Sequence, residues 1–105
     1  TNDAGDFVVY LDANDGGGGL VMKHSAEGKT LVTLNSTVGG TGTVTTYQPN
    51  GKELVDLSAN DSGGKIEVLN KTGEGIVTMS ADEYGNGRVS AYNRKGRGRT
   101  LEPGP

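Results

Sequence analysis

The stretch TGTVTTYQPNGKELVDLS, residues 41–58, predicts a β-hairpin. Two runs rich in β-branched, aromatic and aliphatic residues, 43–47 and 53–57, flank the loop Gln-Pro-Asn-Gly-Lys at 48–52. Proline holds φ at about −65°, which suits the second position of a type I turn. Glycine at the fourth position can take the positive φ that a bulged hairpin loop needs there, whereas a β-branched residue cannot do so comfortably. The stretch therefore reads as strand, glycine turn, strand.

The same unit recurs along the whole chain. Turn glycines stand at positions 5, 28, 51, 73 and 96, with spacings of 23, 23, 22 and 23 residues. Apolar residues recur at the same spacing: the residues seven positions before the turn glycines are Val21, Val44, Ile66 and Val89. Such self-similarity is typical of a repeat protein. The structural turns of the complete hairpins are Gly28, Gly51, Gly73 and Gly96.

One β-repeat domain, 1–105, follows from this spacing. It divides into a half unit at 5–18, full units at 19–41, 42–63 and 64–86, and a terminal half unit at 87–105. We expect polar connections of about seven residues between the hairpins. The last unit breaks the pattern, because Arg-Gly-Arg-Thr at 97–100 replaces the apolar pair, and an irregular second strand is expected there. No apolar helical period survives the glycines and β-branched residues, so we expect no helix.

The distribution of apolar residues over the two faces suggests how the sheet is completed. A three-residue bulged turn would place the residue five before the turn glycine opposite the residue three after it. That register puts Val44 and Leu54 on one face and Tyr47, Val55 and Leu57 on the other. Both faces are then partly apolar, whereas a lone antiparallel sheet usually has one apolar face. We therefore predict an elongated all-β solenoid or prism that other copies of the chain could complete.

Composition excludes several function classes. Hydrophobic residues make up 31% of the 105 residues, which is thin for a core, and 19 glycines without a Gly-X-Y period exclude collagen. The chain has no cysteine and one histidine, His24, so thiol, Ser-His and zinc sites have no credible constellation. We expect no enzymatic activity and no cofactor. A net charge of −3 argues against nucleic-acid binding, and no apolar run is long enough to span a membrane.

The two ends of the chain carry opposite charge. Residues 1–22 hold four aspartates and no base, a net charge of −4, while residues 88–105 hold five bases and one acid, a net charge of +4. This asymmetry predicts head-to-tail association of copies, with the charges setting polarity. The alternative is that the charges only keep two capped ends soluble. The residues assigned to this assembly are Asp3, Asp6, Arg94, Lys95, Arg97 and Arg99.

Oxygen-rich loops offer a second kind of site. Carboxylate and amide oxygens are the ligands that calcium prefers. Their spacing matches neither the EF-hand loop nor the nonapeptide calcium repeat, and Asp and Asn also favour turns through bonds to their own backbone. Turn formation is the favoured interpretation, and calcium binding is the alternative. The weak calcium candidates are Asp12, Asp15, Asp61 and Asp82.

Two segments, KIEVLNKTG at 65–73 and SADEYGNG at 80–87, carry a resemblance. They resemble the 22–23-residue Gly/Asp/Asn-rich β-repeats of uncharacterised bacterial surface or stalk proteins. The resemblance covers most of the chain and implies shape and location, extracellular or at the cell surface, rather than an activity. It assigns no functional residue, and the sequence shows no signal peptide.

Two function hypotheses follow. The first is a structural module of an extracellular or cell-surface fibre, filament or stalk that acts through β-strand stacking and self-association. Its partner is another copy, in a homo-oligomer or a head-to-tail polymer. The alternative is a surface module whose loops or tyrosine column bind a glycan or calcium.

Overall fold

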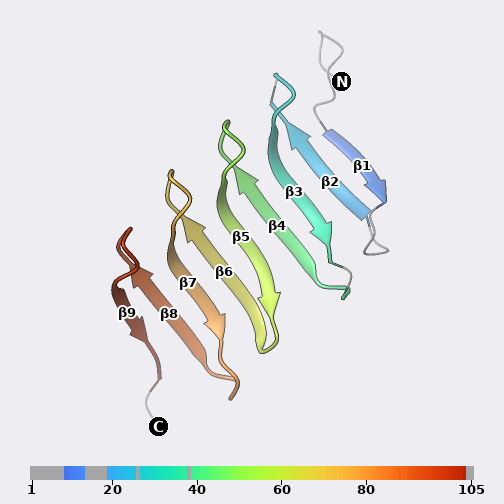
Figure 1. The fold of residues 1–105 in the computed structure, drawn as a ribbon. Helices are drawn as coiled ribbons and strands as arrows, with labels where there is room; N and C mark the ends of the chain where they lie inside the picture. Colours follow the sequence, from blue (N-terminus) through green and yellow to red (C-terminus); the bar gives the residue numbers. More distant parts are fainter. Residues whose placement is uncertain (1–8, 14–18, 26, 38, 104–105) are drawn as a thin grey trace.

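A computed structural model describes residues 9–13, 19–25, 27–37 and 39–103. In these residues the chain forms nine strands of one antiparallel sheet, and their spatial order is their order in the sequence (Figure 1). No helix is present in the described ranges, so the all-β prediction is confirmed. The strands are β1 (Val9–Ala13), β2 (Gly19–His24), β3 (Thr30–Ser36), β4 (Gly42–Tyr47), β5 (Glu53–Asn60), β6 (Gly63–Leu69), β7 (Gly75–Ala81), β8 (Gly87–Tyr92) and β9 (Gly98–Leu101).

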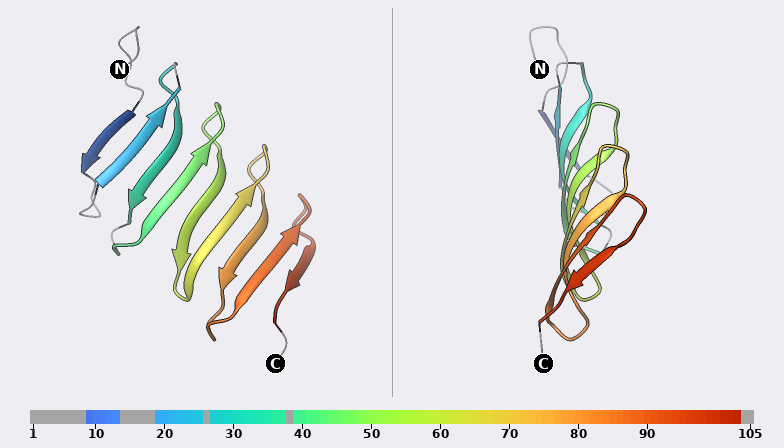
Figure 2. Two further views of the ribbon diagram at one scale, coloured as in Figure 1. Left: turned by 180° about the vertical axis from the view of Figure 1, so that it is seen from behind. Right: turned by 90° about the vertical axis from the view of Figure 1, so that its left-hand side faces the viewer.

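The sheet is a single twisted layer. Figure 2 shows it face-on and edge-on, and its principal extents are 57 × 31 × 16 Å. Each strand packs only against the strands beside it in sequence, because every connection between described strands is a hairpin. β1 and β9 lie at opposite ends, so the described part of the chain does not close into a prism or coil by itself.

The hairpin turns between β2 and β3, β4 and β5, β6 and β7, and β8 and β9 share one edge, the hairpin edge (Figure 1). In the central one, Gly51 N–H donates to the Gln48 carbonyl at 2.9 Å, and Gln48 N–H donates to the Lys52 carbonyl at 2.9 Å. This pattern is a type I turn followed by a glycine bulge. The turn glycines have φ of 79° at Gly28, 90° at Gly51, 94° at Gly73 and 88° at Gly96.

The opposite edge, the connection edge, repeats the same turn chemistry. The links at 37–41 and 82–86 have five residues, and the link between β5 and β6 has two, Asp61 and Ser62. Glycines with positive φ occur here as well, at Gly40, Gly63 and Gly85. The three described links are therefore shorter than the expected polar connections of about seven residues. The strands extend further, and a second compact turn joins each hairpin to the next. The link at 14–18 lies outside the described residues.

A β-bulge sets the register of the central hairpin. Tyr47 lies opposite Glu53, but the preceding residue, Thr46, lies opposite Val55. Leu54 is therefore an extra residue on β5, with no partner position on β4. Beyond it, every residue of β5 is displaced by one position from the register that a simple three-residue loop would give.

Equivalent bulges occur in two other hairpins, at Leu31 of β3 and Ile76 of β7. The expected assignment of faces, which separated Val44 from Leu57, is wrong for this reason. Val44 lies opposite Leu57, and Tyr47 stands on the other face. Since side chains alternate along a strand, the one-residue shift moves a whole set of apolar residues to the opposite side.

The corrected register gathers the aliphatic residues of the strand centres on one face, the apolar face. The other face, the polar face, is mainly polar and carries Met22, Tyr47, Leu69 and Tyr92 in addition. Residues at the middle of the strands form a row across the apolar face, which we call the apolar column. Its described members are Leu11, Leu34, Val44, Leu57, Ile66, Met79, Val89 and Leu101. Toward the connection edge, a small column runs beside it through Ala13, Ser36, Gly42, Ala59, Gly64, Ala81 and Gly87.

Candidate assembly surface

The apolar face is uncovered. Among the residues with a described side chain, no hydrophobic residue is buried, and Leu57, at the centre of the sheet, is 39% exposed. All but one of the exposed large hydrophobic residues lie on this face, the exception being Tyr84 in a turn. A contiguous apolar patch of this kind marks an interaction surface in a soluble protein.

The polar face, in contrast, contains hydrogen bonds between side chains of neighbouring strands. Among its residues with a described side chain, those that are buried are Thr45 and Ser90, which are 7% and 5% exposed. The Thr45 hydroxyl donates to Asp56 Oδ1 across the β4–β5 pair at 3.1 Å. The hydroxyl oxygens of Ser90 and Thr100 lie 2.7 Å apart across the β8–β9 pair. Cross-strand pairs of this kind stabilise a sheet and leave this face compatible with water.

Two neighbouring turns of the hairpin edge, β4–β5 and β6–β7, contact each other. Gln48 Nε2 donates to the Lys71 carbonyl at 2.9 Å, and Lys52 Nζ donates to the Thr72 carbonyl at 3.3 Å. These two turns are therefore held together by polar contacts as well as by the strand ladder.

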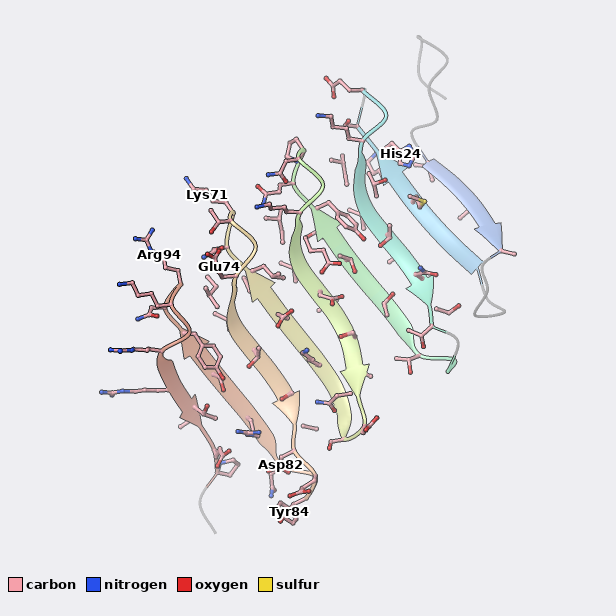
Figure 3. The ribbon with its side chains drawn as sticks, in the orientation of Figure 1. His24, Lys71, Glu74, Asp82, Tyr84 and Arg94 are labelled. Atoms are coloured by element: carbon pink, nitrogen blue, oxygen red, sulfur yellow. The ribbon has the colours of Figure 1, made fainter. Side chains whose placement is uncertain are left out.

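The β6–β7 turn is ordered by its own side chains. Asn70 Oδ1 accepts the backbone N–H groups of Thr72 at 3.1 Å and Glu74 at 3.0 Å. The Thr72 hydroxyl also donates to the Glu74 carboxylate. That hydrogen bond is the main cause that holds the pKa of Glu74 below its ordinary value. Figure 3 shows Glu74 and Lys71 at this turn, on the hairpin edge.

The basic residues predicted to take part in assembly lie on the last hairpin. Arg94, Lys95 and Arg97 occupy the β8–β9 turn and Arg99 lies on β9, and all four are exposed. Arg94 is seen at the hairpin edge in Figure 3. The hairpin brings these four together, whereas their predicted counterparts, Asp3 and Asp6, lie outside the described residues.

The second strand of the last hairpin is regular, contrary to expectation. β9 pairs with β8 from Tyr92 opposite Gly98 to Val89 opposite Leu101, without the bulge of the other hairpins. The straight register is possible because residue 98 is glycine: a Cβ there would lie 1.8 Å from the Ala91 carbonyl oxygen. In the described residues, no strand pairs with the outer edge of β1 or of β9. Such an edge is a template for another strand.

One ion pair joins β8 to the segment after β9. Arg88 Nε lies 2.7 Å from Glu102 Oε1, and the two side chains are 45% and 53% exposed. A pair this exposed contributes about 0–1 kcal/mol to stability. Through this ion pair, Arg88, one of the cations near the C-terminal end, has an acidic partner. Arg88 lies away from the β8–β9 turn that carries the other basic residues.

The calcium candidates are not brought together. Asp61 and Asp82 lie in separate turns of the connection edge, Asp12 belongs to β1, and Asp15 is outside the described residues. Asp82 Oδ1 accepts the N–H groups of Tyr84 at 2.9 Å and Asn86 at 2.8 Å, so it orders its own turn. In the ranges that the structure describes, no three His, Cys, Asp or Glu residues are grouped to hold a metal ion.

Two of the hollows in the described part of the chain are ligand-binding candidates. The first, about 630 Å³, lies toward the hairpin edge and is lined by residues that include Tyr47, Pro49 and Lys29. The second, about 530 Å³, lies at the connection edge beside Tyr84, which is 80% exposed and seen in Figure 3. Both combine an aromatic ring with polar groups.

The apolar face was missed by the sequence reasoning, although a signal for it exists. In the second strand of each full unit, apolar residues stand at alternate positions, such as Val55 and Leu57, with a further one, Leu54, directly before them. An alternating pair preceded by an adjacent apolar residue is what a bulge produces. A register built on the alternating pair would have placed the apolar residues on one face.

No protein-family model matches the chain, and no curated protein matches it. The part of the chain that the structure describes holds no helix that is long and apolar enough to cross a membrane.

Proposed function

We propose that this chain is a structural module that assembles with copies of itself into an extracellular or cell-surface fibre, filament or stalk, and that it is not an enzyme. One observation carries the proposal: the sheet is a single layer in which no described hydrophobic side chain is buried. Burial of apolar surface is the main force that stabilises a fold. A chain with no buried apolar side chain can bury apolar surface by associating with another copy.

The strand order supports growth in one direction. Strands follow one another along the sheet without crossing, and the ladder ends at β1 and β9. A strand from another copy that paired with either edge would continue the same ladder. Head-to-tail contact of this type is heterologous and gives an open filament unless the rotation closes a ring. In the closed version, copies would complete a β-prism or solenoid.

The terminal charges would set the polarity of that contact. The acidic first 22 residues of one copy would meet the basic last 18 residues of the next. Exposed ion pairs contribute only about 0–1 kcal/mol each, so the charges orient the copies while strand pairing supplies the affinity. Salt should then weaken the assembly without abolishing it.

The test is a measurement of mass by light scattering over a range of concentration, at low and at high salt. We expect the mass of the wild type to rise with concentration. Reversal of the four basic residues to glutamate (R94E, K95E, R97E and R99E) should weaken the rise, most strongly in low salt. A variant with one exposed lysine reversed at an inner turn, Lys71→Glu, serves as the control. A wild type that stays monomeric at high concentration in low salt would contradict the proposal.

Glycan binding is a second candidate function, favoured by the hollow beside Tyr47. Tyr47, Pro49 and Lys29 all line it, and ligand sites commonly combine apolar surface with a few polar groups. A glycan-array signal that disappears in Tyr47→Ala would support this candidate. Binding that survives the substitution would remove the hollow as its site.

A further inference from the structure

We infer that the apolar face of one copy packs against the apolar face of a second copy, so that two sheets form a sandwich. This inference deepens the proposed function, because it names the surface and the partner of one contact in the assembly. Strand-edge pairing would extend the ladder in the plane of the sheet, and face pairing would add a second layer. The two contacts use different surfaces and can be tested separately.

The area of the face is sufficient for a stable dimer. Extents of 57 Å by 31 Å enclose a rectangle of roughly 1,800 Å², turns included, which sets an upper limit for one face. A standard interface buries about 800 Å² per partner, so a contact over about half of that rectangle reaches the standard size. The edge of one strand offers far less area, so the face is the larger unpartnered surface.

The composition of the face suits another copy of itself. In its described part, the charged residues are Lys23 and Arg99, near opposite ends of the sheet. Between them the face is aliphatic or small. The apolar column recurs at the strand spacing of about 4.8 Å, and an identical sheet repeats at the same spacing, so side chains of two copies can interdigitate. The small column leaves room beside them for the partner's larger side chains.

Two twofold arrangements can bring the two apolar faces together. A twofold axis that lies between the sheets, over β5 and parallel to its strands, places the β1 end of one copy over the β9 end of the other. A twofold axis between the sheets along their long dimension places each end over its own counterpart. Leu57 belongs to the apolar column on β5, the central one of the nine described strands, so it lies close to the axis in both arrangements.

This geometry makes Leu57 its own neighbour across the interface. The chain has no cysteine, so a single introduced thiol reports one contact without interference. In Leu57→Cys we expect most of the protein to become a disulfide-linked dimer under mild oxidation at micromolar concentration. The matched control is Ser58→Cys, one residue further along β5, whose side chain lies on the polar face. It should remain mostly unlinked.

A second variant checks that the apolar contact itself is responsible. Leu57→Lys should abolish the dimer measured by light scattering, whereas Ser58→Lys should leave it. Circular dichroism shows whether the sheet is retained in both. If Leu57→Lys does not fold, the comparison of Leu57→Cys with Ser58→Cys still tests face pairing, because a cysteine at position 57 adds no charge to the apolar face.

The outcomes separate face pairing from the proposed filament. If Leu57→Cys cross-links no faster than Ser58→Cys while the mass grows with concentration, face pairing is wrong and edge assembly stands. If Leu57→Cys cross-links and the mass stops at two copies, face pairing stands and the filament is wrong. A mass of three copies would overturn the two-layer arrangement in favour of a prism. A monomer without cross-linking would show that the face has a different partner or none.

Discussion

Single residues decide where each strand ends. Asn, Asp, Ser and Thr side chains accept backbone N–H groups in turns along both edges, as Asn93 does from Lys95 and Arg97 and Thr37 does from Thr41. Glycine then reverses the chain, and a positive φ is found only at glycine in the described residues. Turn formation therefore explains the Asp and Asn residues that accept these N–H groups, whereas Asp12 and Asp56 lie on strands.

Gly51→Val tests the conformational requirement at the residue scale. A Cβ at this position would meet nothing within 4 Å, so any loss of stability comes from the φ of 90° and not from crowding. We expect a loss of about 1–3 kcal/mol in the free energy of unfolding. The control is Gly64→Val on β6, where a Cβ is equally uncrowded and φ lies outside the positive region. If the two variants unfold at the same denaturant concentration, the turn argument is wrong.

Glu74 gives a prediction for the dependence of stability on pH. Its pKa is lower in the folded chain than the ordinary 4.5, chiefly because of the Thr72 hydroxyl. Its stabilising contribution is therefore complete above the ordinary pKa and is lost as the pH falls through the folded one. We expect the thermal midpoint of Glu74→Gln to fall less between neutral and strongly acidic pH than that of the wild type. The control is Glu83→Gln, in an exposed turn; an identical acid response in both variants would contradict the role of Glu74.

At the scale of the element, the hairpins differ in one respect. Three of them have an aliphatic bulge residue, Leu31, Leu54 or Ile76, whereas the last hairpin is unbulged at Arg99. The bulge decides which face the following residues occupy. In the last hairpin the chain instead approaches its partner strand closely at Gly98.

Gly98→Ala should therefore weaken the pairing of β9 with β8. The added methyl group would meet the Ala91 carbonyl oxygen and nearby backbone, which cannot move without breaking the β8–β9 pair. At the equivalent Gly75, the nearest atom is Glu67 Oε2 at 3.0 Å, the end of a flexible side chain. We expect amide hydrogen exchange of β9 to accelerate strongly in Gly98→Ala. Exchange in β7 should change little in Gly75→Ala. Equal effects on the two hairpins would show that close approach does not set the last register.

At the scale of the whole molecule, the sheet behaves as a one-dimensional stack. Strands contact only their sequence neighbours, so stability is approximately a sum of local terms and the ends are the weakest part. A chain that ends after residue 81, without β8 and β9, should keep the circular dichroism signal per residue of the remaining strands. Collapse of the whole spectrum on truncation would show that the sheet folds as one cooperative unit.

The sequence by itself determined the strands and turns, because glycine, proline, Asn and Asp at 48–51 and their equivalents act through local backbone preferences. It also determined the absence of a helical period and the opposite charges of the two ends. It did not determine the faces, because the register depends on one extra residue, such as Leu54, whose place in a bulge is settled only when two strands pair. The alternation of Val55 and Leu57 after Leu54 indicates the bulge, but only the tertiary structure decided that Val44 and Leu57 share a face on which no described hydrophobic side chain is buried.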